Sequence, residues 1–159
     1  MNDHSVFVAG LRAERDAFGA LCRLLESEQT CLVRSDIEGL LQLTGAKSER
    51  VDRLIELARQ RADHLESVGL SGGSNGMGDW LAAHAGAQRV ELTQLWDELV
   101  RLASDARTLN EINGKLITTR LSHNQAALSA LQLSARAQNI YGPDGQAAIS
   151  AGQRELGSA

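Results

Sequence analysis

Pro143 is the only proline of the 159-residue chain, and a long apolar series lies before it. This series has steps of three, four or seven residues and comprises Leu92, Leu95, Leu99, Leu102, Ala106, Leu109 and Leu116. Because proline interrupts helices and this spacing keeps one face of a helix apolar, the pattern predicts a helix over about residues 87–137. Such a helix needs neighbours that cover its apolar stripe, since packing supplies most helical stability.

Two further apolar stripes come before this helix and predict two more helices, over residues 4–32 and 36–67. The first stripe comprises Phe7, Leu11, Phe18, Leu21, Leu25 and Leu32, with the polar residues Glu14 and Glu28 in the same register. The second stripe is interrupted by the polar residues Thr44, Lys47 and Arg61. It is widened toward a bundle-type face by Ile37, Leu41 and Ile55.

The connections between these helices carry their own signals. Ser35, followed three residues later by Glu38, has the spacing of a cap at the start of the second helix. Five glycines lie between Gly69 and Gly78, and they predict a flexible linker. A phosphate-binding loop is disfavoured there, because no Gly-Lys-Ser/Thr follows the glycines. Asp79 is placed to cap a short helix over residues 79–85.

These elements predict an all-α fold, an elongated antiparallel up-and-down helical bundle with long coiled-coil-like helices. The bundle would comprise residues 1–135, with Trp80 and Trp96 in its core near the glycine segment. Residues 136–159 would form a Tyr-Gly-Pro turn and a flexible carboxy-terminal segment.

The apolar stripe of the last helix shifts by one position near Asn113-Gly114. Beyond this point it comprises Ile117, Leu121, Leu128, Leu131 and Ala135. No acidic residue lies between Glu111 and Asp144, which makes this part of the chain low in charge. Two interpretations stay open: the stripe packs into its own bundle, or it captures the helix of a partner.

Other features argue against several classes of function. The formal net charge of −4 disfavours a nucleic-acid partner. The four histidines show no metal-ligand spacing, so we expect no metal, no cofactor and no enzymatic activity. Charged residues interrupt every apolar run near the amino terminus, and Cys22 and Cys31 suit a reducing compartment. We therefore expect a cytoplasmic protein without membrane insertion.

Two segments of the sequence resemble the FlgN family of bacterial flagellar export chaperones. The first comprises residues 109–117 (LNEINGKLI) with Leu121, Asn124-Gln125, Leu128 and Leu131, and the second comprises residues 141–146 (YGPDGQ). The resemblance implies a cytoplasmic chaperone that is not an enzyme. Its partners would be the hook-filament junction (hook-associated) proteins, whose carboxy-terminal helices it would keep unassembled, and the flagellar type III export apparatus.

By this resemblance, the substrate-binding region falls within residues 117–159. The contacts are assigned to Leu121, Leu128, Leu131 and Leu133, with Ile140 and Tyr141 as an adjoining or gate-docking element. A function of another class is the alternative: a structural coiled-coil protein that self-associates through its apolar stripes.

Overall fold

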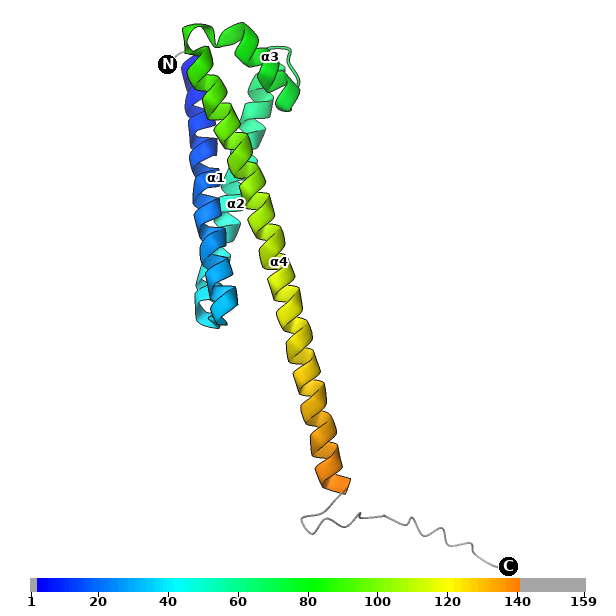
Figure 1. Cartoon of the computed structure of the whole chain (residues 1–159). Helices are drawn as coiled ribbons and strands as arrows, with labels where there is room; N and C mark the ends of the chain where they lie inside the picture. Colours follow the sequence, from blue (N-terminus) through cyan, green and yellow to red (C-terminus); the bar gives the residue numbers. More distant parts are fainter. Residues whose placement is uncertain (1–2, 141–159) are drawn as a thin grey trace, which may run out of the picture. The chain divides into compact units, whose positions relative to one another are not determined.

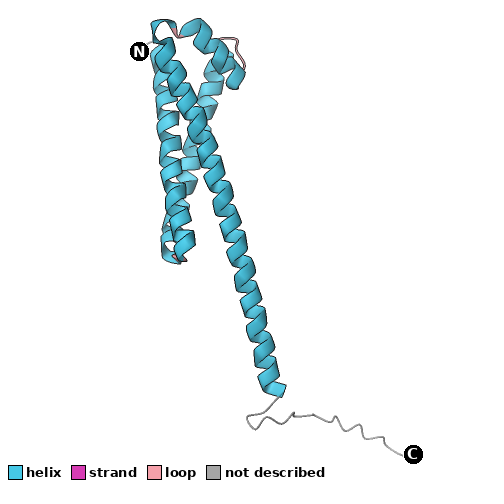
Figure 2. Ribbon diagram, viewed as in Figure 1, coloured by secondary structure: helices cyan, strands magenta, loops and turns pink. Residues whose placement is uncertain are grey.

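The computed structural model describes the backbone of residues 3–140 and the side chains of residues 3–137. Its elements are α1 (Asp3–Arg34), α2 (Ile37–Ser67), α3 (Ser74–His84), the short 3₁₀ helix η1 (Gly86–Gln88) and α4 (Arg89–Ile140) (Figure 1). Residues 3–140 hold no strand, which confirms the predicted all-α bundle (Figure 2). The chain divides into two compact units, Met1–Ile117 and Thr118–Ala159, and the boundary lies within α4.

The reversal between α1 and α2 differs by one residue from the predicted cap. Asp36, not Ser35, caps α2, and its Oδ1 accepts a hydrogen bond of 2.9 Å from the backbone N–H of Gly39. Ser35 adopts a left-handed backbone conformation with φ of 60°. The N–H of Asp36 then reaches the carbonyl of Cys31 and closes the end of α1. Ser35 therefore ends the first helix, and the aspartate after it starts the next one.

The glycine segment is only partly a linker, because α3 begins at Ser74 and not at Asp79. Gly76 and Met77 are buried within this helix. A Cβ atom at Gly76 would overlap the backbone carbonyl oxygen of Ser71, so glycine allows the loop and α3 to approach each other. The prediction of a flexible linker over the whole segment was wrong, because α3 begins within the glycine-rich sequence and packs Met77 and Trp80 into the core.

The close contact between Gly76 and Ser71 makes Gly76→Ala a destabilising change. We expect the variant to lose about 1–3 kcal/mol of unfolding free energy, because the added methyl group forces the backbone of the loop to move. Gly78→Ala is the matched control: among the described residues, no atom lies within 4 Å of a Cβ at that position. It should gain up to about 1 kcal/mol from helix propensity. Urea denaturation measures both changes, and equal stabilities of the two variants would contradict the close contact.

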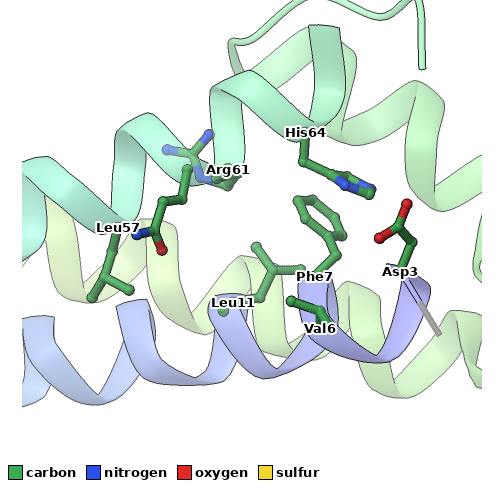
Figure 3. A pocket seen from close by; sticks show the side chains of 9 residues that line it. Asp3, Val6, Phe7, Leu11, Leu57, Arg61 and His64 are labelled. Atoms are coloured by element: carbon green, nitrogen blue, oxygen red, sulfur yellow. The ribbon is translucent and has the colours of Figure 1, made fainter. Parts of the chain in front are cut away.

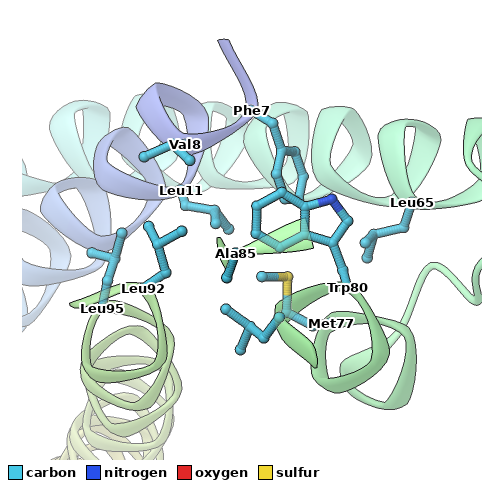
Figure 4. Close-up of a cluster of buried hydrophobic side chains, with 10 residues drawn as sticks. Phe7, Val8, Leu11, Leu65, Met77, Trp80, Ala85, Leu92 and Leu95 are labelled. Carbon is cyan, nitrogen blue, oxygen red and sulfur yellow. The ribbon is translucent and has the colours of Figure 1, made fainter. Parts of the chain in front are cut away.

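The core of the first unit is centred on Trp80, which is 1% exposed. Figure 4 shows its ring among side chains from all four helices of this unit. The surrounding cluster comprises Phe7, Val8, Leu11, Leu65, Met77, Leu81, Ala85, Leu92 and Leu95, and Trp96 packs against it. The prediction that both tryptophans pack in the core is confirmed. A second cluster contains Leu21, Cys22, Leu25, Leu54 and Ala106.

Two ion pairs join α1 to α2 within the bundle. Arg61 donates from Nε and Nη2 to the carboxylate of Glu14 at 2.9 and 3.2 Å, and Glu14 is 1% exposed. Lys47 Nζ lies 3.0 Å from both carboxylate oxygens of Glu28. The charged residues in the two predicted stripes therefore face each other as partners, whereas Thr44 bonds to Leu40 within its own helix. Such pairs favour one register of the two helices over others.

Asn113 of α4 completes the second of these sites. Its Nδ2 donates to the carbonyl oxygen of Leu25 at 2.9 Å and to Oε2 of Glu28 at 2.8 Å. Asn113 is buried, so an amide and a carboxylate meet inside the bundle. The register shift predicted near Asn113-Gly114 thus coincides with a buried polar contact that joins α4 to α1.

The prediction that Ile37, Leu41 and Ile55 widen the buried face of α2 was wrong. They are 65%, 71% and 62% exposed. Successive residues of an α-helix are rotated by about 100°, which places Ile55 about 80–100° from the buried residues Leu54 and Leu65. The apolar residues of α2 therefore do follow a helical period, but part of the apolar surface that they form faces solvent.

Candidate protein-binding surface

The predicted site lies on a part of α4 in which every described side chain from Leu121 to Ala137 is exposed. Its four leucines are strongly exposed: Leu121 58%, Leu128 59%, Leu131 65% and Leu133 67%. Single exposed leucines are common on protein surfaces, whereas several on one helix face indicate an interaction surface. The exposure of these leucines thus favours the second interpretation, in which the stripe is available to a partner.

Helix geometry separates these leucines into two sets. At about 100° per residue, Leu121, Leu128 and Leu131 fall within an arc of about 80°. We call these three residues the leucine stripe. Leu133 lies about 160° around the helix from Leu131, so it does not share this face. The structure therefore brings together three of the four predicted leucines.

The two remaining predicted residues cannot be placed in the same way. Ile140 is the last residue of α4, and its side chain lies outside the described side chains. Tyr141 lies outside the described residues, together with the predicted Tyr-Gly-Pro turn and the segment that follows it.

The surroundings of the leucine stripe are polar but carry few charges. Between Thr118 and Ile140 the charged residues are Arg120 and Arg136, and none is acidic. Amide and hydroxyl side chains such as those of Asn124, Gln125 and Ser129 occupy other positions of the segment. Covering such a surface removes few charges from water, so the desolvation cost of binding a partner helix is small. The arrangement suits the burial of an apolar helix.

The first unit also contains a small pocket (Figure 3). It has a volume of about 110 Å³ and lies between α1 and α2. The ring of His64 stacks on Phe7 with 4.1 Å between centroids, and burial lowers the pKa of this histidine from its usual value. The nearby histidines His84 and His4 also lower this pKa, whereas the negative charge of Asp3 raises it. Among the described residues that line the pocket, none is a serine, threonine or cysteine.

The rest of the described structure adds neither a metal centre nor a membrane span. Within residues 3–137, no cluster of three or more histidine, cysteine, aspartate or glutamate side chains is arranged to hold a metal ion. None of the described helices combines the length and apolar character that crossing a bilayer requires.

Comparison with known proteins gives consistent matches. A family model described as FlgN protein matches residues 1–149. The flagella synthesis protein FlgN of Proteus mirabilis is 30% identical over 120 residues, which cover 71% of this chain and 80% of that protein. The protein of the same name from Yersinia enterocolitica is 38% identical over 56 residues, 35% of this chain and 37% of that protein.

A solved structure extends the similarity to the fold. It is the crystal structure of a candidate flagella synthesis protein FlgN from Pseudomonas aeruginosa, which is 27% identical to this chain. The match has a TM-score of 0.66 and covers 82% of this chain and 96% of that chain.

Proposed function

Because this chain belongs to the FlgN family of flagella synthesis proteins, we propose that it is a flagellar type III export chaperone. In this proposal it acts in the cytoplasm and binds the carboxy-terminal helices of hook-filament junction proteins. It prevents their premature assembly and delivers them to the export apparatus. Chemical catalysis has no part in this role, which requires only a surface that covers another protein's apolar helices.

The exposure of the leucine stripe is the observation that supports this proposal. In the first unit, α4 buries Leu92, Leu95 and Leu99, whereas Leu121, Leu128 and Leu131 are all more than half exposed. A partner helix with an apolar face would bury these three side chains. Full burial of a leucine contributes roughly 1.5–3 kcal/mol, and association has entropic costs of similar total size. A stripe of three leucines therefore suits a reversible complex, as a carrier that must release its cargo requires.

The alternative function is a structural coiled-coil protein that self-associates through its stripes. The heptad spacing in α4 is the feature that favours it. Sedimentation would separate the two functions. A structural protein would form an obligate oligomer whose mass does not change when junction proteins are added, whereas a chaperone would form a new complex with them.

Copurification tests the proposed cargo. We expect the full chain to retain intact junction proteins and to lose them when their carboxy-terminal helices are deleted, because those helices supply the apolar surface. An unrelated soluble protein is the negative control, and its recovery defines the background. Equal capture of the intact and shortened junction proteins would show that the chaperone does not bind those helices.

A further inference from the structure

The first unit has an exposed apolar surface that is separate from the leucine stripe. Its large members lie on α2 and comprise Ile37, Leu41, Val51 and Ile55, all of which are exposed. Thr44 and Ser48 occupy intermediate positions on the same side of the helix. At about 100° per residue, all six residues fall within an arc of about 80°. We call this surface the α2 face, and it runs along about 27 Å of the helix.

The α2 face is distinct from the side of the helix that forms the core. Leu54, Leu57 and Leu65 are buried on that side, and Arg61 and Lys47 reach α1 through their ion pairs. The fold of the first unit therefore uses one side of α2 and leaves a second apolar side exposed. An apolar track of this length on a soluble protein indicates an interface.

A groove adjoins this surface near its Ile55 end. Val51 lines a space of about 270 Å³ together with Phe18 and Leu21 of α1 and Ala106 of α4. Lys47 and Arg107 also line it, and each is paired with a glutamate. All of these residues belong to the first unit. A helix lying along the α2 face could insert an aliphatic side chain there, which would add a specific contact to a shallow apolar surface.

The charge beside the α2 face indicates what kind of helix would fit. Its acidic residues lie about 60–120° around the helix from Ile37 and comprise Glu38, Glu49, Asp52, Glu56 and Asp63. Arg59 lies near the same edge and pairs with Glu56 and Asp63. The edge is thus predominantly negative, and complementarity favours a helix that has an apolar stripe, some basic residues and no acidic ones.

The chain itself contains such a helix. Between Thr118 and Ile140 it has basic residues at Arg120 and Arg136, no acidic residue, and the exposed leucine stripe. The stripe from Leu121 to Leu131 is about 15 Å long, so it fits within the length of the α2 face. We propose that the α2 face of one copy binds the leucine stripe of a second copy.

This pairing has a simple stoichiometry and a consequence for cargo. Two such contacts related by a two-fold axis close a dimer and leave neither surface available for further growth. The pairing itself requires no cargo. If the proposed chaperone function also holds, the dimer covers the leucine stripe when cargo is absent, and cargo competes with the second copy for the stripe.

The test measures the mass of the full chain by sedimentation equilibrium over a range of concentrations, with no other protein present. We expect the mass to rise with concentration from that of one 17.1 kDa chain to that of two. Leu41→Gln with Ile55→Gln on the α2 face should weaken dimerisation by about 10⁴-fold, because the two-fold dimer contains two altered contacts that each lose about 100-fold. Leu128→Gln with Leu131→Gln on the stripe should have the same effect. Val90→Gln, at an exposed valine outside both surfaces, should leave dimerisation unchanged.

Mixing the two double variants provides the sharpest result. Their mixed dimer retains one intact contact, so the mixture should associate more strongly than either variant alone. A wild-type chain that stays monomeric at every concentration would overturn the proposal. A stripe that binds the α2 face of its own chain would give this result. Loss of dimerisation in the α2 variant alone would mean that the α2 face pairs with itself, which would overturn it too. Because no cargo is present, these outcomes are independent of whether the chain binds junction proteins.

Discussion

Leu128→Gln combined with Leu131→Gln should weaken the binding of a junction protein by about 100-fold or more. Each substitution removes a leucine from the same face and places an amide against the partner's apolar side chains. Loss of roughly 1.5–3 kcal/mol at each position gives at least this reduction in affinity. Both side chains are exposed, so the fold should be unaffected. Calorimetric titration with a peptide containing the carboxy-terminal helices measures the change.

Leu133 supplies the matched control for this experiment. It has the same chemistry and similar exposure, but it lies on a different side of α4. Leu133→Gln should change the affinity by less than about 3-fold, whereas Leu131→Gln alone should weaken it by about 10-fold. Equal losses from the two single substitutions would show that binding does not use one face of the helix, and the leucine stripe would no longer be a valid description of the site.

Arg61→Ala should lower the free energy of unfolding by about 3–5 kcal/mol. The substitution leaves the Glu14 carboxylate, which is 1% exposed, inside the bundle without its cationic partner. It also removes the guanidinium group from above the ring of Trp96, where it lies 5.1 Å from the centroid. Urea denaturation followed by circular dichroism measures the loss.

Arg59 on the same helix is the control for Arg61. It also forms two short ion pairs, with Glu56 and Asp63, but these partners lie at the surface. Arg59→Ala should therefore leave the free energy of unfolding close to that of the wild type, because solvent screens exposed ion pairs. Replacing both Glu14 and Arg61 by methionine should restore most of the stability lost in Arg61→Ala. Equal effects of Arg59→Ala and Arg61→Ala would contradict a dominant role of burial.

The all-α fold could be predicted because the spacing of apolar residues directly records which side of a helix is covered. The same spacing does not say what covers it. Ile37, Leu41 and Ile55 have the period of a buried face, yet they are exposed because no other described helix packs over that side of α2. The partners of Glu14 and Glu28 were also hidden, since they lie on another helix and local periodicity carries no information about pairing between helices.

The errors at the helix ends have local causes. Ser35 and Asp36 are both good cap residues, and only the backbone reversal decides which of them starts α2. The start of α3 was missed because glycine has a low helix propensity, whereas the packing of Met77 into the core depends on other helices. The separation of Leu133 from the other leucines, by contrast, follows from counting residues around a helix and could have been predicted.

The amide of Asn113 has a consequence for how α4 can slide along α1. A heptad pattern looks the same after a shift of seven residues, so apolar packing alone would tolerate displacement by two turns. Such a shift would bring Ala106 or Arg120 to the place of Asn113 beside Glu28 and Leu25. Alanine has no donor for these acceptors, and arginine is too large for the same space. A heptad repeat alone allows several registers that differ by seven residues, and the buried amide of Asn113 selects one of them.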